Sequence, residues 1–464
     1  MAAPSYRQFI RDNHDQFESL IQNGTVQPVL LWHLVLPVLL PIVALLIPRP
    51  TGPRHLRPLV LGCIIALAID FIRRRRMLLG GNGYMGGLVP AWWCIWSATL
   101  LVFHDAERDF RRLERRPGQQ QEEVVGWQTY PSRPFSHRLN WVLGLLTNMR
   151  GPEWNWRISS LGPLPASVQS QLDSPTPRFR PEPDDASNPP PPPLRLHLRA
   201  VLALCLQSYL ALDLIKLLMI RDHYFMGLVT DPPTPPFPFT RLSPSPFLVQ
   251  AYRSALTGLG VLSALTYVTS FNPLLFGGLS LAFPRAARAI TSTPLDVAWL
   301  YPPTFGSFLP SILDAGLVGV WSHWWHQIFR FGFISTARAL TPAPHSTHPL
   351  RPLRRVITLL VAFSLSGALH ACGSYAQFRP THPISGTYRF FILQAVGILL
   401  QEFWCRTFLP RVLGGAPRAV KLPGPVRRAG NAAFALGWLL FTGRFIADDF
   451  SRGGLWLTEP LPGY

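Results

Sequence analysis

Two histidines occur in this sequence where histidine is unusual. His370 lies inside an apolar run long enough to cross a bilayer, Val356–Phe378, and it is the one ionisable group there apart from cysteine and tyrosine. Ionisable groups are costly in hydrocarbon unless they face a cavity or a partner, so this histidine indicates a functional site. His326 ends a segment of three tryptophans and two histidines, Trp321–His326, which is too polar to face lipid. We therefore hypothesise a polar reaction chamber among membrane-embedded helices.

A base and a hydrogen-bond donor that face a shared cavity would suit the transfer of an acyl group from a thioester to a hydroxyl. A neutral imidazole at His370 can take the hydroxyl proton, and His326 can hold the thioester oxygen as negative charge develops on it. The small residues just before His370 let a helix or a ligand approach closely. We predict His370 and His326 as catalytic residues, and we expect substrate or coenzyme A contacts from Gln327, Arg330, Trp325, His323 and Ser366.

Each histidine also has an alternative interpretation. His370 could be a structural histidine with satisfied hydrogen bonds, or it could line a transport path. His326 could belong to an aromatic belt at a membrane interface. The motifs of other enzyme classes, such as G-x-S-x-G, H-E-x-x-H and G-x-x-x-x-G-K-[ST], do not occur in the sequence. The five cysteines lack metal-ligand spacing, so we expect no metal site and no bound cofactor.

The composition is that of a polytopic membrane protein. Only 14% of the 464 residues are charged, against roughly 25% in soluble domains. The net charge of +19 would suggest nucleic acid as a partner of a soluble chain. Here the arginines mainly flank apolar runs, as at Arg73–Arg76 and Arg351–Arg355, where anionic lipid headgroups attract such clusters. We therefore expect the lipid bilayer, and no nucleic acid, as a partner.

The order of apolar and polar stretches predicts an all-α bundle of about eight transmembrane helices around a central reaction chamber. We divide the chain into a polar leader at 1–27, N-terminal transmembrane helices at 28–103, a polar loop at 104–195 and a core at 196–464. The expected spans are Val29–Ile47, Leu56–Ile72, Tyr84–Phe103, Leu198–Ile220, Phe247–Phe271, Val356–Phe378, Tyr388–Phe408 and Gly430–Ile446.

Three parts of the polar loop call for separate expectations. Residues 105–123 are charged and rich in glutamine, which predicts a helix or coil. The tract Asp173–Pro193 is rich in proline, which predicts disorder or polyproline II. The amphipathic segment Leu139–Pro165 has two interpretations: a helix in the headgroup layer, or part of the substrate chamber.

Two features of the apolar runs predict a position at or within the membrane surface. The run Leu274–Phe283 is short for a span, and we expect it to be a re-entrant segment. Three tryptophans in the third span indicate a membrane interface: Trp92, Trp93 and Trp96.

Several motifs together resemble the wax-synthase-like branch of the membrane-bound O-acyltransferases, especially its fungal members. A Pro-Pro-x-Phe-Gly-Ser lead-in stands at Pro302–Ser307, a tryptophan- and histidine-rich core ends in Trp-His-Gln at Trp325–Gln327, and S-G-x-x-H stands at Ser366–His370. The R-G-x-x-W-x-W segment at Arg150–Trp156 and the Leu-Asp pair at Leu212–Asp213 also resemble family features. The similarity covers most of the chain from about Leu139 onward.

The resemblance implies an all-helical bundle in which acyl-CoA and the acceptor meet near His370. It assigns the membrane-embedded catalytic histidine to His370 and the core polar position to His326, and it implies direct transfer without a covalent acyl-enzyme at Cys372. The sequence departs from the family at Val320, Ser322 and His323, where Phe, Gly and Arg are usual. In place of that arginine, His323 or Arg330 is expected to contact the coenzyme A phosphates.

The resemblance further implies an acyltransferase that takes an acetyl group from acyl-CoA as co-substrate. The expected acceptor is a hydroxyl of a lipophilic small molecule, a terpenoid or meroterpenoid secondary metabolite. Esterification of long-chain alcohols, as in a wax-ester synthase, is the alternative acyl transfer. A small-molecule transporter, which would also carry intramembrane histidines, is the alternative of another class. We expect a multi-pass protein of the endoplasmic reticulum.

Overall fold

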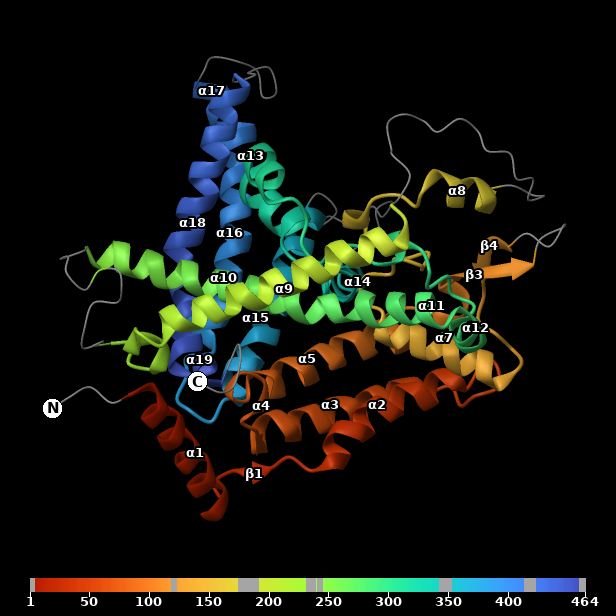
Figure 1. The fold of residues 1–464 in the computed structure, drawn as a ribbon, viewed down its shortest axis with the longest axis horizontal. Helices are drawn as coiled ribbons and strands as arrows, with labels where there is room; N and C mark the ends of the chain where they lie inside the picture. The colour runs from red at the N-terminus through yellow and green to blue at the C-terminus, as the bar shows by residue number, and fades with distance from the viewer. Residues whose placement is uncertain are drawn as a thin grey trace.

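The computed structural model describes residues 5–117, 123–173, 192–230, 239, 245–341, 353–412 and 423–458 as a bundle of helices (Figure 1). The N-terminal elements are α1 (Tyr6–Gln22), β1 (Gln27–Pro28), α2 (Leu31–Leu46), α3 (Leu56–Arg74), β2 (Arg75–Arg76), α4 (Leu79–Asn82), α5 (Tyr84–Ala98), α6 (Ala106–Asp109), β3 (Arg112–Pro117), β4 (Glu123–Gln128), α7 (Phe135–Thr147) and α8 (Ala166–Asp173). The remaining elements are α9 (Leu194–Met219), α10 (Pro246–Asn272), α11 (Gly278–Ala282), α12 (Pro284–Ile290), α13 (Phe308–Gly319), α14 (Arg330–Ala339), α15 (Arg354–Ala376), α16 (Arg389–Phe403), α17 (Leu409–Val412), α18 (Gly424–Arg452) and α19 (Leu455–Thr458).

The predicted all-α membrane bundle is confirmed, because helices dominate the described residues and four of them are long and apolar enough to cross a membrane. These four are Tyr84–Phe103, Leu194–Met219, Pro246–Ala282 and Arg354–Ala376. All eight predicted spans are helical in the structure, but the crossing of the membrane by all eight stays a prediction.

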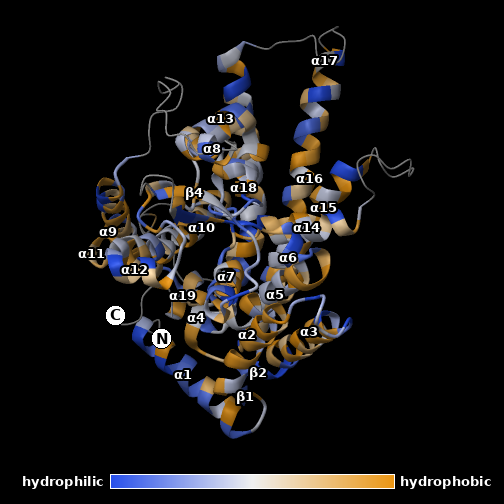
Figure 2. Ribbon diagram, turned by 90° about the vertical axis from the view of Figure 1, so that its right-hand side faces the viewer, coloured by the Kyte–Doolittle hydropathy of each residue, from blue (hydrophilic) through white to orange (hydrophobic). Residues whose placement is uncertain are grey.

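Helix α9 shows how these helices expose apolar side chains and bury polar ones. Leu206, Leu210 and Leu214 recur every fourth residue on one face and are largely exposed. On the opposite face Lys216 is fully buried, and its Nζ donates a hydrogen bond of 2.6 Å to the carbonyl oxygen of Trp456. Figure 2 shows that apolar residues, in orange, make up much of helices such as α2 and α3. Such a pattern is stable in lipid, where the surrounding medium is apolar.

Within the segment 105–123, residues 112–117 form a strand where a charged helix or coil was expected. After the short helix α6, the chain enters β3, which pairs antiparallel with β4. Arg112 opens β3 and is buried, with its guanidinium donating hydrogen bonds to Gln128 and Asn140. For residues 112–117 the expectation of a helix or coil was wrong, because pairing with β4, which lies beyond residue 122, satisfies the backbone of this charged strand.

The run Leu274–Phe283 is no separate re-entrant segment. It continues α10 through a π-helical turn, Pro273–Gly277, into α11, so that residues 246–282 form one apolar helix. Pro273 does not break this helix, because the wider turn accommodates a residue without a backbone N–H. The proline-rich tract expected at Asp173–Pro193 falls almost wholly outside the described residues.

The tryptophans of α5 face the protein, contrary to the expected membrane interface. Trp92 and Trp96 are buried and stack on each other, and Trp96 donates to the carbonyl oxygen of Leu146. Trp93 donates to the carbonyl oxygen of Pro37 in the middle of α2. The tryptophans of α5 therefore belong to a packed core between helices.

The segment Leu139–Pro165 packs into the protein. Trp141 and Trp154 are buried with their rings in an edge-to-face contact. Trp156 stacks on Phe331 of α14 with ring centroids 4.3 Å apart. A helix lying free in the headgroup layer would leave these rings in contact with lipid, so the structure favours the second interpretation, a part of the core beside the site.

Helix α13 is broken at Gly316, where φ is +61° and ψ is −138°. A side chain at this position would be strained and would lie about 2.5 Å from the Gln401 amide nitrogen. Gln401 of α16 bonds both sides of the break, accepting from the Leu317 N–H and donating to the Ala315 carbonyl oxygen. The break brings the chain that follows α13 back towards α15 and α16, where the candidate site lies.

Candidate active site

His370 lies on the inner part of α15, half-buried between two aromatic rings. The ring of Phe391 from α16 stacks on the imidazole with centroids 4.5 Å apart and an angle of 14° between the planes. On the other side, a hydrogen bond of 2.6 Å joins Nδ1 of His370 to the hydroxyl of Tyr84 at the start of α5. Nε2 makes no hydrogen bond with the described residues. The imidazole therefore faces neighbouring helices and has one nitrogen uncommitted.

Tyr84 is a residue of the site that the sequence did not indicate. It stands 286 positions before His370 and is buried, 2% exposed, against the ring of Phe450. The one local signal is the glycine-rich stretch before it, Gly80–Gly83, whose residues all have positive φ and start α5 abruptly. That stretch indicates a special backbone conformation but not a partner for a histidine.

Glycines on both helices make the contact between Tyr84 and His370 possible. A Cβ atom on Gly373 would lie 2.9 Å from the Tyr84 ring, and one on Gly87 would lie 1.8 Å from the carbonyl oxygen of Cys372. Larger side chains at these positions would push α5 away from α15. Gly367, one of the small residues noted in the sequence, is in turn approached by the ring of Tyr388.

The turn that carries His326 is held by the residues that follow it. Gln327 donates from its amide to the carbonyl oxygens of Trp321 and Trp325, at 2.9 and 2.6 Å. Arg330 donates to the Gln327 amide oxygen and to the Ser322 carbonyl oxygen. Both polar atoms of the Gln327 side chain are therefore bonded within the turn. Arg330 forms these bonds with Nη1 alone, which leaves Nε and Nη2 of its guanidinium for a further partner.

His326 has a ring nitrogen without a partner. Its Nδ1 is buried and makes no hydrogen bond with the described residues. His326 lies outside the expected spans, and burial together with the charge of Arg150 lowers the pKa of its imidazole to about 4. A neutral ring with an unpaired buried nitrogen is costly unless a ligand supplies the missing partner. This arrangement fits a site for a polar atom of a substrate.

Arg150 joins two of the motifs that stand far apart in the sequence. Its guanidinium donates hydrogen bonds of 2.8 and 2.7 Å to the carbonyl oxygens of Pro302 and Pro303. Gly151 has a φ of +62°, and a Cβ atom there would collide with the ring of Trp156. The R-G-x-x-W-x-W segment thus folds over itself and fixes the Pro-Pro lead-in beside His326.

The lead-in also packs against the turn itself. The N–H of Gly306 donates to the carbonyl oxygen of Trp324, and a Cβ atom at Gly306 would lie 2.3 Å from the His323 carbonyl oxygen. The ring of Phe305 makes edge contacts with Trp325 and His326. The glycine of the Pro-Pro-x-Phe-Gly-Ser motif is required by this close approach of two backbones.

A row of aromatic rings connects the two histidines. His326 contacts Trp325, Trp325 contacts Trp321, and Trp321 contacts Phe391, the ring stacked on His370. The structure therefore brings the two predicted catalytic residues into one neighbourhood.

The other predicted site residues divide between this neighbourhood and the surface. Ser366 is half-buried one helical turn before His370 on the same side of α15. Trp325 is part of the row of rings. His323 is exposed, and its Nδ1 is bonded to the Ser322 hydroxyl at 2.7 Å.

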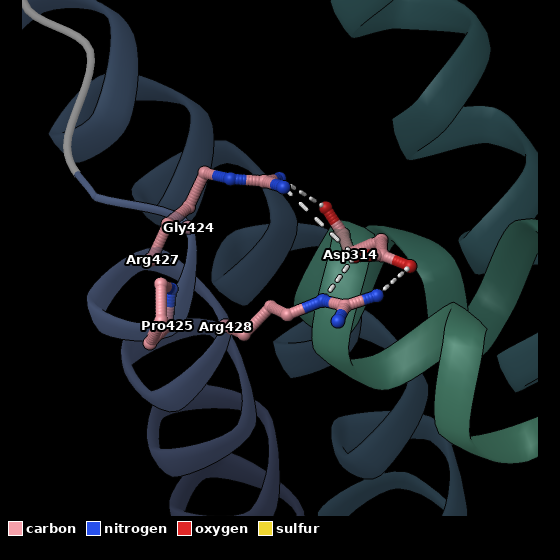
Figure 3. A pocket seen from close by; sticks show the side chains of 5 residues that line it. All are labelled: Asp314, Gly424, Pro425, Arg427 and Arg428. Atoms are coloured by element: carbon pink, nitrogen blue, oxygen red, sulfur yellow. Dashed lines mark hydrogen bonds and ion pairs between the residues drawn. The ribbon is translucent and has the colours of Figure 1, made fainter.

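Two surface pockets lie elsewhere. One of about 430 Å³ is lined by Asp314, Arg427 and Arg428 at the junction of α13 and α18 (Figure 3). The other, of about 400 Å³, lies at the connection between α2 and α3. Since neither is lined by His326 or His370, the central reaction chamber stays a prediction.

The family comparison matches the part of the chain that holds both histidines. Residues 301–393 match the model of the membrane bound O-acyl transferase family. Over these residues the chain is similar to that family. The resemblance seen in the sequence is thereby confirmed at the level of the family, and the matched range runs from the Pro-Pro lead-in through α15 to the start of α16.

Three curated relatives of this chain come from fungi. The O-Mevalon transferase macI of Penicillium terrestre is 29% identical over 34% of this chain and 35% of its own length. The O-Mevalon transferase yanI of Aspergillus niger is 25% identical over 64% of this chain and 59% of its own. The acetyltransferase eriL of Hericium erinaceus is 38% identical over 29% of this chain and 33% of its own.

The chain thus spans about a third of the first of these relatives and under two thirds of the second. No solved structure matches the chain.

Proposed function

We propose that this chain is a membrane bound O-acyl transferase, which transfers an acetyl group from acetyl-CoA to a hydroxyl of a lipophilic secondary metabolite. The observation that carries the proposal is the pair of imidazoles in one neighbourhood, each with a ring nitrogen that has no partner among the described residues. Acetyl as the acyl group is supported by the names of three fungal relatives, each of which is an acetyltransferase. An acceptor of terpenoid or meroterpenoid type is part of the proposal and rests on the family resemblance.

In the proposed reaction, Nε2 of His370 takes the proton of the acceptor hydroxyl. The acceptor oxygen then attacks the thioester carbon, and an N–H of neutral His326 stabilises the oxygen that becomes negative. When the carbon–sulfur bond breaks, the proton on His370 passes to the departing thiolate, which gives the ester and free coenzyme A. Both histidines end the cycle neutral, and no acyl-enzyme forms.

Tyr84 has a positioning role in this proposal. For Nε2 to act as a base, the proton of neutral His370 must be on Nδ1, where it is donated to the oxygen of the Tyr84 hydroxyl. Phe391 fixes the plane of the ring by stacking. In this proposal the Tyr84 hydroxyl accepts the hydrogen bond of the reactive tautomer and holds it in place without touching the substrate.

Tyr84→Phe is expected to lower kcat roughly tenfold to a hundredfold, the usual effect of removing the partner that orients a histidine. KM is expected to stay unchanged, because the variant keeps the ring beside Gly373 and removes only the hydroxyl. The measurement is steady-state acetylation in membranes. Tyr388→Phe is the matched control, since Tyr388 packs against α15 at Gly367 but does not bond His370. An equal loss in both variants would contradict the role of Tyr84.

The proposed function is tested by product formation. Membranes that contain the full chain are expected to convert labelled acetyl-CoA and a panel of terpenoid alcohols to acetate esters, which mass spectrometry identifies. Palmitoyl-CoA with long-chain alcohols tests the wax-ester synthase, and a mevalonyl thioester is included because of the two O-Mevalon transferases. Movement of an alcohol across sealed vesicles without any ester would instead indicate a transporter. We further propose the endoplasmic reticulum as the location.

A further inference from the structure

The segment that joins α2 to α3 encloses a pocket that the acyl-transfer site does not use. Its volume is about 400 Å³. Figure 1 shows α2 and α3 side by side, with the connection at one end of the pair. Three arginines line the pocket together with apolar side chains of α3 and of the π-helical turn Thr99–Phe103: Arg49, Arg54, Arg57, Leu56, Leu101 and Val102.

Arg57 is a buried charge with an unused donor. The residue is 5% exposed, and one side of its guanidinium forms an ion pair with Glu107. The other terminal nitrogen, Nη1, is buried and has no hydrogen-bond partner among the described residues. Leaving such a donor unpaired is costly, so an oxygen atom of a ligand in this pocket would be stabilising.

The charges around the pocket leave an excess of positive charge. Arg49 lies 3.6 Å from Asp105 and donates to the carbonyl oxygens of Leu101 and His104. Arg54 is exposed and makes no ion pair with the described residues. Three guanidinium groups thus face two carboxylates, Asp105 and Glu107, and an anion is favoured.

The pocket adjoins exposed apolar side chains, so its surroundings suit a lipid. Val43 at the end of α2, Leu59 on α3 and Val102 are 53%, 66% and 44% exposed, and they form an apolar surface next to the arginines. A ligand with a phosphate at one end and hydrocarbon at the other would satisfy both parts. We propose that this pocket binds the phosphate of an anionic phospholipid, with an acyl chain on the adjoining faces of α2 and α3. The same phosphate chemistry occurs in coenzyme A, which lacks the hydrocarbon.

The test uses the full chain purified in a neutral detergent. The probes are dioctanoyl phosphatidic acid, dioctanoylglycerol, which has the same chains without phosphate, and coenzyme A. Dioctanoyl phosphatidic acid is expected to raise the unfolding midpoint by roughly 3 °C or more, and dioctanoylglycerol by much less. In Arg54→Gln the shift is expected to disappear while the midpoint without lipid is unchanged, because Arg54 is exposed and unpaired among the described residues.

Arg73→Gln is the matched control. Arg73 lies at the opposite end of α3, is also exposed, and lines neither pocket. It is expected to keep the full shift. Three results would overturn the proposal: an equal shift with dioctanoylglycerol, an equal loss in Arg73→Gln, or a shift with coenzyme A alone that Arg54→Gln removes. None of these depends on acyl transfer, so the result stands apart from the proposed function.

Discussion

His370→Ala is expected to lower the rate of ester formation by roughly 10²–10⁴-fold, the usual contribution of a general base. The variant removes the nitrogen that takes the acceptor proton and leaves the Tyr84 hydroxyl without its partner. Because the interaction acts in the transition state, kcat and kcat/KM are expected to fall together. The measurement is acetylation of the best acceptor from the panel, with the amount of protein in the membranes determined in parallel.

Cys372→Ala is the matched control for His370→Ala. Cys372 lies two residues further along α15 and is the thiol nearest to the site in the sequence. Full activity of this variant is expected, since direct transfer needs no acyl-enzyme. Activity retained by His370→Ala, or lost with Cys372→Ala together with a labelled acyl-enzyme, would contradict the proposed mechanism.

His326→Ala is expected to lower kcat by roughly 10²–10³-fold, the usual effect of removing a donor to a developing oxyanion. His326→Asn keeps an N–H at this position and is expected to recover part of that activity. A histidine with a purely structural role would give a different result: a lower unfolding midpoint for both variants and no recovery by asparagine. The measurements are steady-state kinetics and thermal unfolding of the two variants and the parent chain.

The pH dependence distinguishes His326 from its asparagine replacement. Burial and the charge of Arg150 lower the pKa of His326 to about 4, against an ordinary value of 6.5. Between these values the unfolded chain binds a proton that the folded chain excludes, so stability falls as the pH falls through this window. Above pH 6.5 this contribution is fully present. We expect the unfolding midpoint of the parent chain to fall more steeply over this range than that of His326→Asn.

Much of the helical arrangement could be predicted because its signals are local. An apolar run of about twenty residues must satisfy its own backbone hydrogen bonds in lipid, and so Val356–Phe378 was expected to be a helix. The strand β3 could not be predicted in the same way, because its backbone is satisfied by β4 across undescribed residues. The prediction that Trp92 and Trp96 lie at a membrane interface was wrong, because composition does not reveal which side of a helix packs against another helix.

In the candidate site, too, features with a local signal could be predicted from the sequence, whereas contacts between distant segments could not. His370 was found from its own sequence surroundings, as a polar group inside hydrocarbon. Arg150 was noted as part of a motif, but its hydrogen bonds to Pro302 and Pro303 join segments 152 and 153 residues apart. Gln327 was expected to bind a substrate, whereas its amide holds the turn that carries His326.

The sequence by itself determined that this chain forms apolar helices and carries two histidines in unusual surroundings, since hydropathy and residue type are local properties. Only the tertiary structure decided that Tyr84 bonds His370, that Phe391 stacks on its ring, and that the nitrogen of His326 is left without a partner among the described residues. Those contacts depend on how closely glycines such as Gly87 and Gly373 let α5 approach α15, and no spacing along the chain encodes that distance.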